Sequence, residues 1–314
     1  MSLIIASQLE ADFNRNLGLH PSGPTLIDVA EDEPWTAASE ADILLVRPTP
    51  AWRQSTHLRP HIWPGRLKWV YSASAGVDFY PGWLLDAPLV TCGRGVASEE
   101  IADYVIAAIY AHAKNLEAVT VRSRAEWAHV PLGRVSGTTI GIVGLGAIGA
   151  AVARRGLALG AQVIGLRRSG AQSGISGVQH VGDLETLVGE ADHIVVAVPG
   201  TPQTRHLFNE ALFARTRPGA HIINVARGSV IDQDALIDAL DRRRLGFATL
   251  DVTEPEPLPE GHALYTHPRV RLTPHISSNY SLVRHRLLEK IQDDLSRFVR
   301  GERPTDIVDP GRGY

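Results

Sequence analysis

A glycine-rich turn between a strand and a helix constrains this chain more than any other feature. The apolar run Thr139–Val143 leads into Gly144, Gly146 and Gly149, and a helical pattern follows. Glycines spaced as G-x-G-x-x-G permit a tight turn and a close approach of the backbone to a ligand, and the helix N-terminus offers N–H groups to a pyrophosphate. Because another predicted strand follows the helix, the sequence predicts a dinucleotide-binding βαβ unit.

The chain after Ser98 alternates short apolar runs with helical stretches. A helix is predicted from Ser98 to about Val121, with Ser98 as its cap and acidic residues in its first turn. Strands that alternate with helices indicate an α/β fold with a doubly wound parallel sheet of the Rossmann type. The predicted strands are Thr139–Val143, Gln162–Leu166, His193–Val198, His221–Val225, Ala248–Val252 and Val270–Leu272, and the other predicted helices are Ala147–Leu159, Gln233–Arg243 and Ser281–Arg300.

The residues before Ser98 also have the pattern of an α/β layer. Short apolar runs at Ile43–Val46, Lys68–Ser72 and Leu89–Thr91 are each followed by glycine, proline or serine, which is typical of strands in such a layer. The chain has 314 residues, which at about 150 residues per domain is enough for two domains. We therefore expect a second, smaller α/β domain in addition to the dinucleotide-binding one.

Composition excludes several classes of partner. The 31 Lys and Arg residues are balanced by 34 Asp and Glu residues and are scattered, so a nucleic-acid partner is not expected. The longest apolar run, Ile101–Ala113, is too short to span a bilayer and contains Asp103, so no membrane role is expected. The single cysteine, Cys92, cannot form an internal disulfide, which fits a reducing compartment. We therefore expect a cytoplasmic protein.

The residues that follow the predicted strand Gln162–Leu166 bear on the choice of cofactor. In this fold an acidic residue at that position accepts hydrogen bonds from the ribose 2′-hydroxyl of NAD. Here Arg167 and Arg168 follow the strand instead, and two guanidinium groups can pair with a 2′-phosphate. The sequence therefore favours NADP(H), with NAD(H) as the second cofactor. Two solvated loop arginines are the alternative interpretation.

Charged residues follow three of the predicted strands, at the edge where open parallel sheets bind ligands. Arg227 and His275 each follow one strand, and Glu254 and Glu256 follow a third. Reduction of a 2-oxo acid needs a cation for the carboxylate and ketone, a hydride donor, and an acid near neutrality. Arg227 can supply the cation and His275 the acid, and a carboxylate beside the imidazole fixes its tautomer and favours its charged form. Either glutamate could take that place, and either could be a solvated loop residue.

Several stretches of the sequence, in order, carry a resemblance to a known family. They are SAGVD, TIGIVGLGAIG, VPGTPQTRHLFN, INVARGSVIDQDAL, LDVTEPEPLP, TPHIS and VDPGRGY. With these motifs, from about Leu44 to the C-terminus, the chain resembles the D-isomer-specific 2-hydroxyacid dehydrogenases, in particular the branch of glyoxylate and hydroxypyruvate reductases. The resemblance implies an NADP-preferring dehydrogenase that reduces a small 2-oxo acid to the D-2-hydroxy acid.

The resemblance also implies a domain arrangement and an oligomeric state. A flavodoxin-like substrate-binding domain would comprise residues 1–98 and 282–314. The Rossmann domain, residues 99–281, would be inserted into it. Members of the family commonly dimerise through the cofactor domain, with the helix from Ser98 involved, so a homodimer is expected.

The resemblance places functional residues at three sets of positions. The catalytic residues fall on Arg227, Glu256 and His275, which favours Glu256 over Glu254. The backbone that binds the substrate carboxylate falls on Ala75, Gly76 and Val77, with Arg227 as a further substrate contact. Cofactor contacts, besides the glycines of the turn, fall on Ala147, Ile148, Arg167, Pro199, Thr204, Val225, Ala226 and Asp251. Many members carry aspartate where Arg167 stands, a departure that again favours NADPH.

Other interpretations stay open at this point. Some relatives of this fold resemble nucleotide-sensing corepressors that bind proteins instead of turning over a substrate, and the sequence discriminates them weakly. Formate-oxidising relatives typically carry glutamine where Glu256 stands, so formate oxidation is disfavoured. Arg47 could reach the far end of a substrate or be a plain surface arginine. The sequence contains no zinc or serine-hydrolase motif, so no metal is expected.

Overall fold

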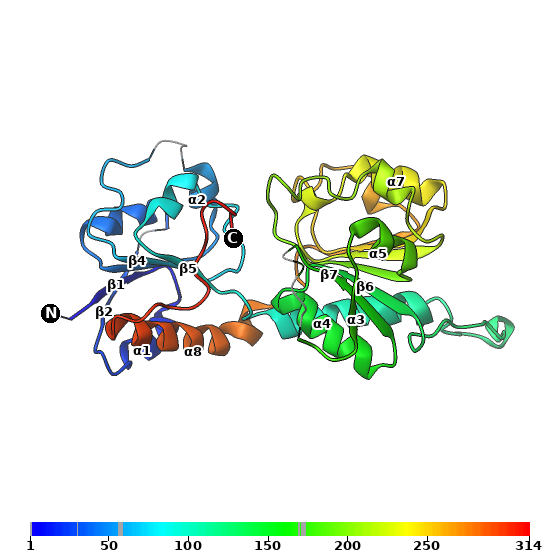
Figure 1. Ribbon diagram of the computed structural model, residues 1–314, viewed down its shortest axis with the longest axis horizontal. Coiled ribbons are helices and arrows are strands. Elements are labelled where there is room, and N and C mark those ends of the chain that lie inside the picture. The colour runs from blue at the N-terminus through cyan, green and yellow to red at the C-terminus, as the bar shows by residue number, and fades with distance from the viewer. Residues whose placement is uncertain (1, 30, 56–58, 169, 171–173) are drawn as a thin grey trace. The chain divides into compact units, whose positions relative to one another are not determined.

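The chain divides into two compact units, each with its own parallel sheet (Figure 1). The computed structural model describes residues 2–29, 31–55, 59–168, 170 and 174–314. Unit 1 comprises Met1–Val96 and Tyr280–Tyr314, and unit 2 comprises Ala97–Asn279. Both crossings between the units lie at the start of a helix, two residues before the boundaries expected from the sequence.

Unit 2 is built on a seven-stranded parallel sheet. Its strands are β6 (Thr139–Val143), β7 (Gln162–Leu166), β8 (Val178–His180), β9 (His193–Val196), β10 (Ala220–Asn224), β11 (Leu245–Leu250) and β12 (Val270–Leu272). They lie in the order β12-β11-β10-β9-β6-β7-β8, so the direction of winding reverses between β6 and β9. Sheets of this kind bind ligands at the carboxyl ends of the strands, at such a reversal.

Helices cover both faces of the sheet in unit 2, which is why its central strands are buried apolar runs. The helices are α3 (Ser98–Lys114), α4 (Ala147–Ala158), α5 (Leu184–Glu190), α6 (Glu210–Phe213) and α7 (Gln233–Asp241). α3 and α4 pack together on one face, and α5 and α7 cover the other (Figure 1). Each face has its own apolar core.

Unit 1 contains a five-stranded parallel sheet and is assembled from both ends of the chain. Its elements are β1 (Ile4–Ser7), α1 (Ala11–Gly18), β2 (Thr25–Asp28), β3 (Ile43–Val46), α2 (Pro50–Gln54), β4 (Trp69–Ser72), β5 (Val90–Cys92) and α8 (Tyr280–Val299). The strand order β2-β1-β3-β4-β5 is that of flavodoxin-like folds. α1 and α8 cover one face (Figure 1). The other face carries aromatic rings, and Trp83 lies 5.0 Å from Trp63 and 6.1 Å from Trp52 between centroids.

The structure confirms the predicted fold class, a Rossmann-type sheet with a smaller flavodoxin-like domain. Strands β3, β6, β7 and β12 match their predicted bounds, and the other predicted strands differ by three residues or fewer at each end. Strands β1, β2 and β8 and helices α1, α2, α5 and α6 were not predicted. β8 is a short, partly exposed edge strand without a clear apolar pattern. Among the described residues, none of the helices has the length and apolar character needed to cross a membrane.

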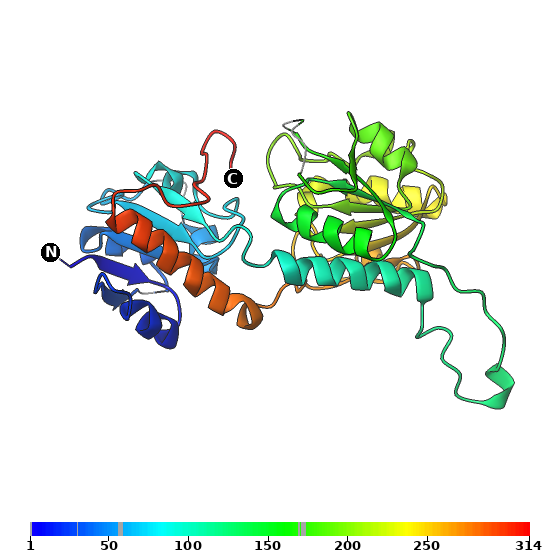
Figure 2. The same ribbon diagram turned by 60° about the horizontal axis from the view of Figure 1, so that its bottom comes forward.

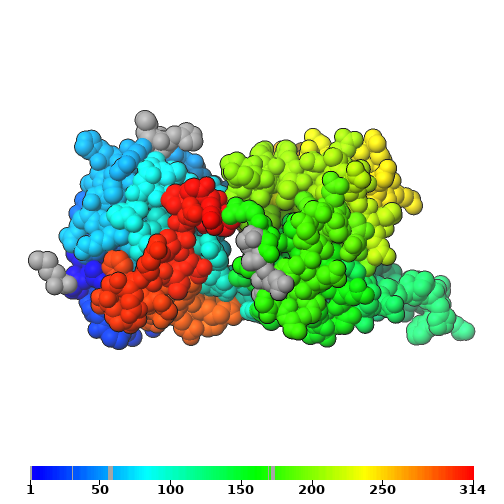
Figure 3. All heavy atoms as spheres, in the orientation of Figure 1, coloured from blue at the N-terminus to red at the C-terminus, as the bar shows by residue number. Residues whose placement is uncertain are grey.

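The prediction that α3 continues to about Val121 is wrong. The helix ends because Asn115 adopts a left-handed conformation with a φ of 38°, which commonly terminates helices. Residues 115–132 then form an excursion from unit 2 that we call the arm (Figure 2), and in Figure 3 it projects from the surface of this unit. The N–H of Gly133 donates to the carbonyl of Ala113 at 2.9 Å and closes the base of the arm.

Candidate active site

The predicted phosphate-binding turn joins β6 to α4. Gly144 has a φ of 103°, a left-handed value that a side chain would strain. A Cβ on Gly149 would lie 2.1 Å from the carbonyl oxygen of Gly144, so only glycine lets the helix begin this close to the turn. A Cβ on Gly146 would meet nothing within 4 Å in the described part of the chain, so the space in front of this backbone is open.

The start of α4 is suited to an anion. No side chain of the described residues caps this helix at Gly146, and the first N–H groups of a helix have no partner within the helix. The N–H groups of Ala147 and Ile148 therefore belong to a terminus that favours negative charge. The open backbone at Gly146 and the uncapped terminus together fit the pyrophosphate of a nicotinamide dinucleotide.

Arg167 and Arg168 lie at the carboxyl end of β7, and both are exposed. The N–H of Gly144 donates to the carbonyl of Leu166 at 3.1 Å, which holds this strand end beside the glycine turn. The two arginines therefore follow the strand at the position where this fold reads the adenosine ribose of a dinucleotide. Their charge fits a 2′-phosphate at that position.

His275 and Glu256 form a hydrogen-bonded pair at the carboxyl edge of the sheet. The imidazole Nδ1 lies 3.0 Å from Glu256 Oε1, and the two side chains are 48% and 31% exposed. Because an ionised carboxylate only accepts, Nδ1 carries a hydrogen, and Nε2 is the nitrogen left to exchange a proton with a ligand. Glu254 pairs with Arg205 instead, at an N–O distance of 2.8 Å. The structure thus brings Glu256, and not Glu254, to the imidazole.

Arg227 follows β10 in a turn that Asn224 holds. The buried Asn224 side chain accepts from the N–H of Ala226 at 3.0 Å and donates to the carbonyl of Arg227 at 2.9 Å. A Cβ on Gly228 would lie 1.9 Å from the backbone of Thr253, so glycine is required where this turn touches the segment that leads to the glutamates. Asn224 was not predicted as a site residue, although a polar residue that closes a buried apolar strand was a signal for it.

The remaining predicted cofactor positions follow β9, β10 and β11, which are neighbours in the sheet. Thr204 Oγ1 donates to the carbonyl of Pro199 at 2.7 Å and closes the loop after β9. Val225 and Ala226 are buried directly after β10, and Asp251 is completely buried directly after β11. The structure therefore places these residues along one edge of the sheet in unit 2.

Unit 1 carries the predicted carboxylate-binding segment shortly after β4. Ala75 is exposed, Gly76 is half-buried and Val77 is buried, and Ser74 Oγ donates to the carbonyl of Gly76 at 2.6 Å. This bond shapes the turn at the carboxyl end of the sheet in unit 1. Arg47, which follows β3, pairs with a glutamate of the same unit at an N–O distance of 2.5 Å, so its guanidinium already has a partner within the protein.

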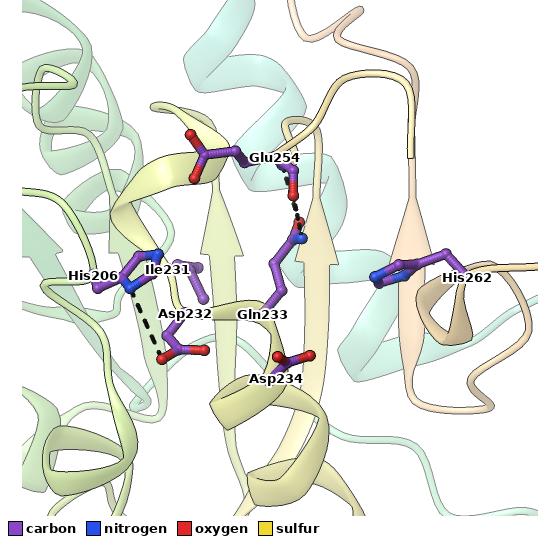
Figure 4. Close-up of a pocket in the computed structure, with 7 residues that line it drawn as sticks. All are labelled: His206, Ile231, Asp232, Gln233, Asp234, Glu254 and His262. Atoms are coloured by element: carbon purple, nitrogen blue, oxygen red, sulfur yellow. Dashed lines mark hydrogen bonds and ion pairs between the residues drawn. The ribbon is translucent and has the colours of Figure 1, made fainter. Parts of the chain in front are cut away.

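Unit 2 also contains a polar cavity of about 290 Å³ at the start of α7 (Figure 4). It is lined by His206, Ile231, Asp232, Gln233, Asp234, Glu254 and His262. The Gln233 side chain donates to the carbonyl of Glu254 at 2.6 Å and accepts from its N–H at 3.1 Å, which fixes the rim of the cavity. The described residues Arg227, Glu256 and His275 are not among those that line it, so we do not assign the chemistry of the sheet edge to this cavity.

Comparison with known proteins identifies relatives of this chain. Residues 106–277 match the family described as D-isomer specific 2-hydroxyacid dehydrogenase, NAD binding domain. The glyoxylate/hydroxypyruvate reductase A of Serratia proteamaculans (strain 568) is 33% identical over 262 residues, which cover 80% of this chain and 82% of that protein.

Two solved structures share the fold over the whole length of both chains. A D-isomer specific 2-hydroxyacid dehydrogenase from Xanthobacter autotrophicus Py2, in complex with NADPH and MES, has a TM-score of 0.82 and 28% identity, with 100% of each chain covered. An NADPH-dependent glyoxylate/hydroxypyruvate reductase from Sinorhizobium meliloti, in complex with NADP and sulfate, has a TM-score of 0.80 and 26% identity, again with 100% of each chain covered. The chain therefore belongs to the D-isomer specific 2-hydroxyacid dehydrogenase family, with a domain that binds a nicotinamide cofactor.

Proposed function

We propose that this protein is a reductase that converts a small 2-oxo acid to the D-2-hydroxy acid. The observation that carries the proposal is the pair of His275 and Glu256 at the carboxyl edge of a Rossmann sheet. This edge is where the fold binds ligands, and a histidine held by a carboxylate is suited to donate a proton near neutral pH. The similarity to reductases named for glyoxylate and hydroxypyruvate supports these two acids as substrates.

The residues at the carboxyl edge of this sheet have different roles in the proposed reduction. When bound, the reduced cofactor supplies a hydride for the carbonyl carbon of the substrate. Arg227 binds the substrate carboxylate and polarises the carbonyl group. His275 donates the proton on Nε2 to the carbonyl oxygen as negative charge develops there, while Glu256 keeps the hydrogen on Nδ1 and balances the charge of the ring. The N–H groups of residues 75–77 bind the substrate carboxylate.

We propose NADPH as the preferred cofactor and NADH as the second. Arg167 and Arg168 place two positive charges where the fold reads the 2′ position of the adenosine ribose. Both similar solved structures carry the phosphorylated cofactor, NADPH in one and NADP in the other, which supports this preference.

We also propose that the protein is a homodimer that associates through unit 2. The arm exposes Leu116, Trp127 and Val130, which are 64%, 76% and 54% accessible. Apolar side chains gathered on one projecting segment commonly mark an interface between proteins. A second copy of the chain is the partner we expect, with α3, from which the arm departs, at the interface.

A reducing, cytoplasmic location completes the proposal. Cys92 is the single cysteine of the chain, and it is buried. Burial also raises the pKa of its thiol, which disfavours the reactive thiolate. A single buried cysteine cannot form a disulfide within the chain, and this supports a reducing compartment such as the cytoplasm.

Steady-state kinetics test the reductase proposal. The purified protein should oxidise NADPH in the presence of glyoxylate or hydroxypyruvate. His275→Ala should lower kcat by roughly 10²- to 10⁴-fold with little change in cofactor affinity, the usual contribution of a positioned proton donor. Glu256→Gln keeps the shape but removes the negative charge that balances the imidazole ring, so kcat should fall. Glu254→Gln is the matched control, because Glu254 pairs with Arg205 and not with His275. Tight cofactor binding without turnover of any 2-oxo acid would contradict the proposal and indicate a nucleotide sensor.

A further inference from the structure

A chain of hydrogen bonds leads from α3 to the loop that carries His275. Tyr104 Oη lies 2.6 Å from Thr273 Oγ1, and Thr273 Oγ1 lies 2.6 Å from Asp251 Oδ1. An ionised carboxylate only accepts, so the Thr273 hydroxyl donates to Asp251 and its oxygen accepts from Tyr104. Burial raises the pKa of Tyr104, which keeps its hydroxyl protonated and able to donate.

Asp251 is the centre of this network. Its side chain is completely buried and accepts the backbone N–H groups of Ile276 and Ser277, each at 2.9 Å. Its own carbonyl accepts the N–H of His275 at 2.8 Å. Together with the Thr273 hydroxyl, these bonds tie the loop that follows β12 to the end of β11.

The loop after β12 contains a residue in an unfavourable backbone conformation, which the hydrogen bonds to Asp251 stabilise. His275 has a φ of 53°, a left-handed value that persists in a residue with a side chain only where the surroundings enforce it. The imidazole is 48% exposed, so packing alone does not fix the ring. The position of Nε2 therefore depends on Glu256 and on the backbone that Asp251 holds.

We propose that Tyr104, Thr273 and Asp251 form a positioning relay for His275. The inference rests on the proposed function, in which His275 donates the proton. Tyr104 and Thr273 act through the loop and not on the reacting atoms, and each hydrogen bond of the relay polarises the next. A misplacement of about 1 Å can lower the rate roughly 10²-fold. Because the relay holds the loop that carries His275, loss of the relay should lower kcat. The role of Asp251 is thus to hold the proton donor as well as to meet the cofactor.

Thr273→Val is the sharpest perturbation of the relay, because valine has nearly the shape of threonine but lacks the hydroxyl. Thr273→Ser keeps the hydroxyl and serves as the rescue. Tyr104→Phe removes the first hydroxyl of the relay, and Tyr110→Phe, at a partly exposed position of the same helix, is the matched control. Asp251 is kept, because a change there would also alter a predicted cofactor contact.

Two readouts distinguish positioning from a general structural role. In the protein without substrate, hydrogen–deuterium exchange of the peptide that contains Ile276 and Ser277 should accelerate by about tenfold or more in Thr273→Val. In the kinetic assay, kcat should fall by roughly 10- to 100-fold in Thr273→Val and by a smaller factor in Tyr104→Phe. The Kd for NADPH should change by a smaller factor than kcat in either variant, because both variants retain Asp251, the predicted cofactor contact.

The outcomes that overturn the relay are distinct from those that overturn the proposed function. Unchanged exchange and unchanged kcat in both Thr273→Val and Tyr104→Phe would overturn the relay. An equal loss in Thr273→Ser would also overturn it, because packing and not the hydroxyl would then be responsible. Absence of turnover in the wild type would overturn the proposed function, and the exchange measurement would still test the relay in the resting protein.

Discussion

Replacement of Gly146 by alanine should separate cofactor binding from folding. Gly146 has φ and ψ values of −81° and −157°, an extended conformation that alanine adopts without strain. The added Cβ would meet nothing within 4 Å among the described residues. The free protein should therefore keep its stability or gain about 0.4–1 kcal/mol, because alanine restricts the unfolded chain.

The same Cβ should weaken cofactor binding. It would occupy the space in which a pyrophosphate approaches the backbone of the turn. A hydrogen bond from a backbone N–H to a charged group is worth about 1.5–3 kcal/mol. Loss of one such bond should therefore raise the Kd for NADPH by roughly 10- to 150-fold.

Gly149→Ala is the matched comparison, because the same substitution falls on the same turn. Its Cβ would lie 2.1 Å from the carbonyl oxygen of Gly144, and this backbone atom cannot move aside as a flexible side chain would. Overpacking of this kind costs about 1–3 kcal/mol, so this variant should melt at a lower temperature. Calorimetry of the free protein and fluorescence titration with NADPH measure the two effects. Unchanged cofactor affinity in Gly146→Ala, or a loss of stability equal to that of Gly149→Ala, would refute the reasoning.

Three further outcomes are expected. Arg167→Asp should reverse the ratio of kcat/KM for NADPH and NADH, because it replaces a partner for a 2′-phosphate with an acceptor for a 2′-hydroxyl; a wild type that prefers NADH would contradict the cofactor proposal. Burial lowers the pKa of His193 to about 4 and lowers that of His221 as well, so their contribution to stability is complete above about pH 6.5 and is lost as the pH falls toward the folded-state values. For His193 the loss at pH 5 should be about 2 kcal/mol in urea unfolding, and His193→Asn should flatten this dependence whereas His129→Asn, in the exposed arm, should not. Trp127→Ser should weaken the proposed dimer in sedimentation experiments, and a wild type that sediments as a monomer at all concentrations would exclude the dimer.

Local sequence pattern was sufficient to predict most of the strands of unit 2 and its glycine-rich turn. The strands β6 and β7 and the turn from Gly144 to Gly149 were predicted because apolar runs and glycine spacing are properties of neighbouring residues. Prediction failed at β8, which is short and partly exposed, because such a strand has little apolar pattern to find. It failed also at Asn115, where one left-handed residue ends α3 although helical spacing continues in the sequence.

The tertiary structure decided what depends on residues far apart in the chain. Glu254 and Glu256 each precede a proline, and the residues around them left both open until the family resemblance favoured Glu256. The fold supplies the contacts, in which Glu256 reaches His275 and Glu254 pairs with an arginine. Tyr104 carries no motif, and it meets Thr273 because α3 packs on the sheet of unit 2. Residue types at strand ends therefore predicted the chemistry, whereas the hydrogen bonds that position it follow from how whole helices and strands pack.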